Sequence, residues 1–177
     1  MTKQELIDSF YKNHLELLDY IVALDDEAFS RSAHGKWTAG QQLSHVYLCL
    51  QPISQALGSK EYILQKFGKL DRISMDYEKI ILMYTSALEK GGKAPERFVP
   101  EIVNTSDRIQ LSIDFNELLL KLNSQLGEYS EDELNSLILP HPLLGNLCIS
   151  ELIYLMTYHA THHLLQTKKN LETFINS

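Results

Sequence analysis

Cysteine is scarce in this chain, since its 177 residues include only Cys49 and Cys148. The two lie far apart in apolar stretches, and no Cys-x-x-Cys pair occurs. This excludes a disulfide framework of the kind that stabilises small secreted domains, and it excludes a cysteine-rich zinc site. Free thiols suit a reducing compartment, so we expect a cytoplasmic protein whose cysteines are ordinary buried residues.

Long apolar runs are also missing. No window approaches the roughly 18 consecutive apolar residues that a membrane-spanning helix needs. The first six residues, MTKQEL, lack the basic segment and following apolar run of a secretory signal. We therefore expect no membrane partner and no export.

Basic residues are outnumbered, with 16 Lys and Arg against 23 Asp and Glu and a formal net charge of −7. An acidic chain is poorly suited to neutralising phosphates, so nucleic acid is not an expected partner. Hydrophobic residues make up 44% of the chain, which is enough to close a core. The length fits one domain, and we expect residues 1–177 to form it.

The alternating pattern of strands does not occur with flanking hairpin signals, so no sheet is expected. Internal repeats and low-complexity segments are absent as well. Apolar residues recur instead at three- and four-residue steps, the spacing of an amphipathic helix. This spacing predicts helices over 3–24, 39–57, 74–90, 112–127 and 149–172.

Capping patterns and loop residues refine this prediction. The Ser/Thr-x-x-Glu/Gln pattern of a capping box occurs at Thr2–Glu5, Thr38–Gln41 and Ser130–Glu133. The chain between Gly58 and Asn104 is too long for a tight turn, and we expect it to cross between the second and third long helices and to carry an extra helix. The expected fold class is therefore all-α, a four-helix bundle with an extra helix in that connection.

Three of the seven histidines lie together in the stretch YHATHHLLQ, residues 158–166. His159 and His163 are four residues apart, so their side chains share one helix face and can hold one cation. His162 is rotated by about 100° from His163 around the helix axis, so only one of these two can sit centrally.

His45 is a candidate third ligand, because it lies beside the apolar stripe of the second long helix. Facing helices of a bundle often build such sites, and three imidazoles would leave a coordination position open for water or substrate. The alternative is that His45 is a hydrogen-bonded core histidine. The spacing alone does not separate these two interpretations.

Two stretches of the chain resemble the DinB-like (DinB/YfiT-like) family of small helical metalloenzymes, which includes bacillithiol-type S-transferases. One is Trp37-Thr38 followed by His45, and the other is the turn HPLLGNL at 141–147, then Glu151 and the helix YHATHHLLQ. The resemblance implies a four-helix bundle and a divalent metal ion, Ni, Zn, Fe or Mn, on His45, His159 and His163. His162 would then be the histidine that does not bind the metal.

Four further residues are candidates for contacts around such a site. Gln41, Tyr158 and Glu151 are positioned to accept or donate hydrogen bonds near the ligands, although each can equally be an exposed polar residue. For Glu151 the alternative is an acid favoured by the dipole of the first helical turn. His14 lies on the apolar side of the first helix, where it can transfer protons or contact substrate.

Three other residues are expected to be structural. His34 and His141 fall in predicted loops and are interpreted as structural or solvent-facing. Trp37, the sole tryptophan, is interpreted as a hydrophobic anchor at the entry to the second long helix.

These observations favour a metal-dependent enzyme that activates a thiol or water, similar to a thiol S-transferase or a hydrolase. Its substrate would be a small molecule, and the resemblance points to a low-molecular-weight thiol. No catalytic residue stands out by motif, so a non-catalytic metal- or ligand-binding bundle, acting as a homodimeric stress or sensing protein, remains the alternative. A bundle whose histidines bind nothing is the third hypothesis.

Overall fold

The computed structural model describes residues 1–32 and 35–175, with side chains described as far as residue 172. His34, expected in a loop, lies outside the described residues. The protein is mostly helical, as the periodicity predicts. Among the described residues, no helix combines the length and the apolar character needed to cross a membrane.

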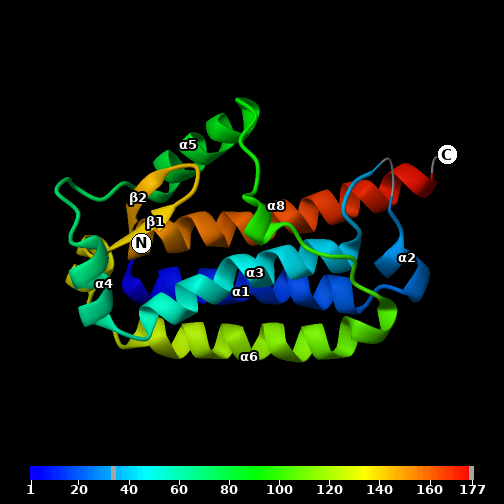
Figure 1. Cartoon of the computed structure of the whole chain (residues 1–177), viewed down its shortest axis with the longest axis horizontal. Coiled ribbons are helices and arrows are strands. Elements are labelled where there is room, and N and C mark those ends of the chain that lie inside the picture. Colours follow the sequence, from blue (N-terminus) through cyan, green and yellow to red (C-terminus); the bar gives the residue numbers. More distant parts are fainter. Residues whose placement is uncertain (33–34, 176–177) are drawn as a thin grey trace.

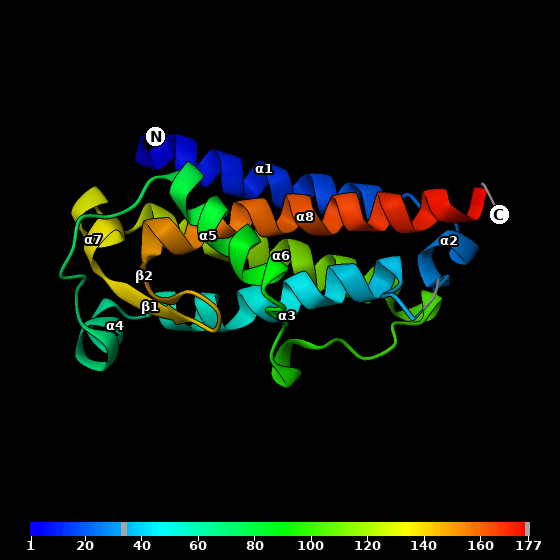
Figure 2. The same cartoon turned by 90° about the horizontal axis from the view of Figure 1, so that it is seen from above.

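Four long helices lie side by side and form the body of the molecule (Figure 1). They are α1 (Lys3–Val22), α3 (Ala39–Leu57), α6 (Arg108–Gly127) and α8 (Ile149–Ile175). α1 and α8 run in one direction, and α3 and α6 run in the other (Figures 1 and 2). α1 packs on both α8 and α6, and α3 packs on the same two helices.

The predicted capping boxes are confirmed. Thr2 and Glu5 cap α1, Thr38 and Gln41 cap α3, and the box at 130–133 starts the short α7 (Glu131–Ser136). The predicted bounds of α3 agree with the structure, whereas α1 ends two residues early and α6 begins four residues early. α6 begins early because a 3-10 turn, η2 (Thr105–Asp107), leads directly into it.

The apolar faces of the four long helices form one continuous core. Its fully buried side chains include Phe10, Leu17, Ile21, Leu43, Leu50, Phe115, Leu119, Leu122 and Ile153. A short helix, α2 (Asp26–Ser30), closes one end of this core by burying Phe29. Burial of these faces provides the main free energy that holds the helices together.

The connection between α3 and α6 carries two helices rather than the single extra helix that was expected. They are α4 (Lys60–Phe67) and α5 (Tyr77–Glu89), followed by a 3-10 turn, η1 (Glu96–Phe98). Because α3 and α6 run in the same direction, the chain must return along the body before α6 begins, and Figure 2 shows the segment after α5 beside α3. This segment and α5 cover one side of α3 and α8.

The expectation of no sheet is wrong. β1 (Ile138–His141) and β2 (Gly145–Cys148) pair antiparallel, with Leu139 opposite Leu147. Each strand has only four residues, too few for an alternating pattern to stand out. Pro140 is exposed and lies on a strand with one paired edge there, and Gly145 has a φ of 71°, so both residues fit a short two-stranded hairpin.

Candidate metal centre

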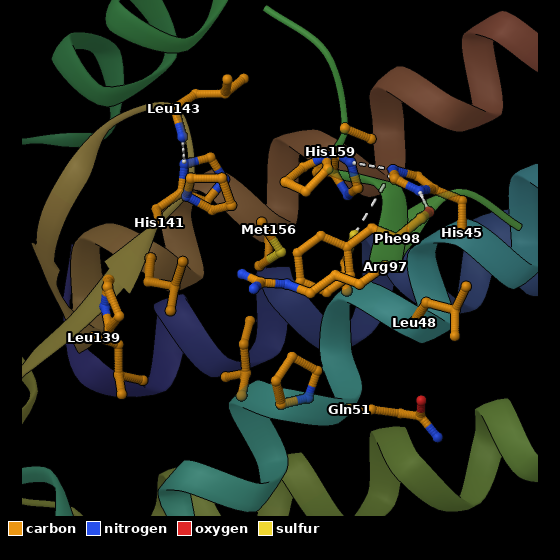
Figure 3. Close-up of a pocket in the computed structure, with 18 of the residues that line it drawn as sticks. His45, Leu48, Gln51, Arg97, Phe98, Leu139, His141, Leu143, Met156 and His159 are labelled. Carbon is orange, nitrogen blue, oxygen red and sulfur yellow. Dashed lines mark hydrogen bonds between the residues drawn. The ribbon is translucent and has the colours of Figure 1, made fainter.

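Three histidines from two distant helices converge at one point. Nε2 of His159 lies 3.2 Å from Nε2 of His45 and 3.0 Å from Nε2 of His163. All three side chains are buried. His45 comes from α3, and the other two lie one turn apart on α8, so the packing of these helices creates the cluster (Figure 3 shows His45 and His159).

The outer nitrogens of two of these rings are held by acceptors. Nδ1 of His45 lies 2.6 Å from the carbonyl oxygen of Phe98, and Nδ1 of His163 lies 2.5 Å from Oε1 of Gln42. An oxygen acceptor requires a proton on the nitrogen that faces it, so each Nδ1 donates. Nε2 of both rings must then present a lone pair in the neutral imidazole.

The inward-facing lone pairs of His45 and His163 are two acceptors at the centre of the cluster, and each needs a positive partner. A neutral His159 can donate from Nε2 to only one of its two neighbours, because it carries one proton. The remaining lone pair needs a cation or another donor, and in the metal-free protein the thiol of Cys49, 3.7 Å from Nε2 of His45, is placed to be that donor. The three nitrogens therefore match the donor set of a divalent metal ion.

The spacing of the nitrogens also fits a metal ion. Two nitrogens each about 2.1 Å from a tetrahedral zinc ion lie about 3.4 Å apart. The separations of 3.2 and 3.0 Å are close to this value. A small adjustment of the rings would accommodate an ion among them.

Burial keeps the three imidazoles in the form that binds metals. It lowers the pKa of His45 and places the pKa values of His159 and His163 well below the usual value, with His45 adding to the effect on both. At neutral pH the rings are uncharged and each keeps a lone pair for coordination.

Cys49 is a further possible ligand that sequence reasoning missed, and the group that it forms within the described residues does not include His163. Its Sγ lies 3.7 Å from Nε2 of His45, and His45, Cys49 and His159 offer ligand atoms within 4.8 Å of one another. Burial raises the pKa of this thiol to about 12, so it is protonated unless a cation binds beside it. The signal in the sequence is the four-residue step from His45 to Cys49, which places the two side chains on one face of the helix.

A cavity of about 740 Å³ opens beside the histidine cluster. Its walls come from α3, α4, α5, α8, the hairpin and the segment 93–98, and Figure 3 shows labelled side chains from several of these elements around it. The connection between α3 and α6 thus encloses space that the four long helices alone would leave open. This volume is ample for a small molecule next to the imidazoles.

The hydrogen-bond partner of the cluster is Gln42 rather than Gln41. Gln41 completes the cap of α3 and donates to the carbonyl of Pro100 at 3.5 Å, so it does not contact the histidines. Neighbouring residues on a helix point about 100° apart, and the rotation of α3 directs Gln42 toward His163.

Glu151 is fully buried and does not contact the cluster. Its carboxylate accepts hydrogen bonds from the Arg72 guanidinium at 2.6 and 2.9 Å and from the backbone N–H groups of Met75 and Cys148. The exposed interpretation and the role beside the ligands are therefore wrong, whereas the interpretation as an acid in the first turn of α8 is confirmed. Glu151 instead joins the start of α8 to the loop before α5.

Tyr158 and His162 lie beside the cluster. The Tyr158 ring packs against those of Tyr84 and His162, and no hydrogen bond to a clustered histidine is found among the described residues. The His162 ring is 5.2 Å from that of His163 and lines the cavity. Its nitrogens do not join the three converging Nε2 atoms, consistent with the angular argument.

His14 is buried in the core and does not line the cavity among the described residues. Its Nδ1 donates to the Phe10 carbonyl, and its Nε2 is buried without a hydrogen-bond partner in the described chain. Burial lowers its pKa to about 4, so the ring is neutral. A substrate contact by His14 is not supported by this placement.

His141 and Trp37 line the cavity. His141 was expected in a loop but ends β1, and its Nδ1 accepts hydrogen bonds from the backbone N–H groups of Leu143 and Leu144 (Figure 3). It therefore stabilises the hairpin turn. The Trp37 ring lies 4.8 Å from the His45 ring, so this side chain packs on the cluster as well as preceding α3.

Comparison of the chain with models of known protein families and with curated proteins finds no match.

Proposed function

We propose that this protein is a divalent-metal-binding member of the DinB-like family and that it activates a thiol or water on a small-molecule substrate. His45, His159 and His163 would hold the ion, which can be Ni, Zn, Fe or Mn. The observation that carries the proposal is the meeting of three Nε2 atoms, with the outer nitrogens of two rings bound to acceptors. The fold class within this proposal is the DinB-type four-helix bundle.

A divalent ion held there would supply a Lewis acid that lowers the pKa of a thiol or a water molecule. The surrounding residues contribute orientation and exclusion of water. Phe98 and Gln42 orient two of the imidazoles, and Trp37 and Tyr84 pack against the cluster. Low-molecular-weight thiols are the substrates that the family resemblance favours, with transfer to an electrophile as the reaction.

Metal binding is tested by elemental analysis of purified, untagged protein and by calorimetric titration with Zn²⁺ and Ni²⁺. We expect about one equivalent of metal, and at least a hundredfold loss of affinity in His163→Ala. His162→Ala is the matched control, because it removes the adjacent imidazole and should keep the affinity. Protein that takes up no divalent metal would overturn the proposal, and so would equal affinity in the two variants.

Turnover is tested separately with metal-loaded protein and panels of thiols and electrophiles. We expect product formation that His163→Ala abolishes and His162→Ala retains. Turnover that survives the loss of His163 would contradict a metal-centred reaction.

Cys49 favours a second candidate function, a metal-binding or sensing bundle without catalysis. Four protein ligands close a zinc site, and closed sites are structural, whereas catalytic sites keep a position open. The visible spectrum of the Co²⁺-loaded protein separates the two functions, because thiolate ligation adds a charge-transfer band. A band that disappears in Cys49→Ser would support the closed site of a sensing protein, which would act as a homodimer. The absence of the band in the wild type would support the open site.

A further inference from the structure

The cavity beside the histidine cluster has an unusual charge distribution. The chain carries 23 acidic residues and a net charge of −7, yet no acidic residue of the described chain lines this cavity. Its lining residues with a permanent charge are Lys93 and Arg97. A cavity lined by cations alone in an acidic protein attracts anions and disfavours cationic ligands.

Lys93 and Arg97 are both exposed, and within the described residues neither forms an ion pair. The guanidinium of Arg97 lies 4.8 Å from the centre of the Phe98 ring, which limits its freedom. Figure 3 draws Arg97 beside Phe98 among the residues that line the pocket.

The rest of the cavity offers mainly apolar contacts. Leu48, Ile53, Leu139, Leu152 and Met156 are among the side chains that line it. A ligand that fills this space must therefore present a large apolar surface.

The segment that carries Lys93 and Arg97 also contacts the histidine cluster. This short segment ends at Phe98, whose carbonyl accepts the hydrogen bond from His45. A negative group paired with these cations would thus lie at the rim beside the cluster, and the remainder of the ligand would extend over the apolar walls.

From the charge, the lining and the placement of this segment together, we infer that the cavity binds a small molecule with an extended apolar body and one anionic group, which pairs with Arg97 and Lys93. The inference rests on the proposed function only in taking this cavity as the substrate site of the metal centre. It names the chemical class of the substrate, an apolar molecule with one anionic group.

The test measures binding of straight-chain carboxylates by calorimetry and by the fluorescence of Trp37, the sole tryptophan, which lines the cavity. Decanoate should bind about five- to tenfold more tightly than the uncharged decanamide, because only the carboxylate forms a charge-assisted pair. Hexanoate should bind at least tenfold more weakly than decanoate, because it buries fewer methylene groups.

Arg97→Gln and the double variant Arg97→Gln with Lys93→Gln should lose the preference for decanoate over decanamide while still binding decanamide. Lys121→Gln is the matched control, since it removes one positive charge from an exposed position on α6, outside the cavity lining. Equal binding of decanoate and decanamide to the wild type would overturn the inference. Unchanged preference in the double variant, or no binding of either probe, would overturn it too.

Each titration is run on metal-free and on Zn²⁺-loaded protein, and on His163→Ala. Decanoate binding that persists without metal and in His163→Ala supports pairing with the two cations. Binding that requires the metal and disappears in His163→Ala would place the carboxylate on the ion, which overturns the inference and leaves the proposed function standing. Failure of metal binding with intact decanoate binding would overturn the proposed function alone.

Discussion

Oε1 of Gln42 lies 2.5 Å from Nδ1 of His163, and both side chains are buried. This contact joins α3 to α8 and directs Nε2 of His163 toward the other two imidazoles. The orientation of the third ligand therefore depends on a residue that does not itself reach the centre of the cluster.

Replacing Gln42 by leucine should lower the affinity for Zn²⁺ by about 10- to 100-fold, because His163 loses the acceptor that fixes its ring and tautomer. Calorimetric titration measures the change. Gln41→Leu is the matched control, since Gln41 serves the cap of α3 and not the histidines. Equal losses in the two variants would show that helix stability, rather than ring orientation, controls the affinity.

Glu151 should make the protein sensitive to acid. Burial alone would raise its pKa, but hydrogen bonds from Arg72 and from two backbone N–H groups outweigh that effect and hold the pKa below the usual 4.5. The stabilisation is therefore complete above about pH 4.5 and is lost as the pH falls through the folded-state value.

Substitution of Glu151 by glutamine should lower the free energy of unfolding at pH 7 by about 2–4 kcal/mol. The same variant should show a shallower loss of stability below pH 4.5. Urea denaturation at several pH values measures both effects. Glu117→Gln, at an exposed position on α6, should change neither, and an unchanged acid slope in Glu151→Gln would contradict the assignment.

His14 should contribute a second pH dependence with the same sign. Its pKa is about 4 in the folded protein and about 6.5 when exposed, so the unfolded chain takes up a proton first as the pH falls. Folding stability should then decrease between pH 6.5 and pH 4, by up to about 3 kcal/mol from this residue. His14→Leu should flatten this part of the curve in metal-free protein, and superimposable curves would contradict the prediction.

Gly40 permits close contact between α2 and α3. A Cβ atom at this position would lie 2.7 Å from Cζ of Phe29, a fully buried ring, and 3.1 Å from Cβ of Val103. Gly40→Ala should therefore lower the free energy of unfolding by about 1–3 kcal/mol, despite the better helix propensity of alanine. Gly127→Ala is the control, because a Cβ atom at that position would have nothing within 4 Å. This variant should not lower the free energy of unfolding. Thermal unfolding compares the two.

Local spacing was sufficient to predict much of the helical structure. Residues three and four apart share a helix face whatever surrounds the helix, so the pairing of His159 with His163 and the caps at Thr2 and Thr38 could be predicted from neighbours in the chain. The hairpin was missed because its two short strands derive their stability from pairing with each other, which leaves little local pattern.

The contacts between helices could not be obtained in this way, because they depend on how each helix is rotated and on where the long connection runs. The rotation of α3 brings Gln42, rather than Gln41, to His163 and sets Cys49 beside His45. The path of residues 58–104 pairs Arg72 with Glu151 and places Arg97 on the cavity. Periodicity along the chain thus specified which residues face inward, and the packing of distant segments specified which of them meet.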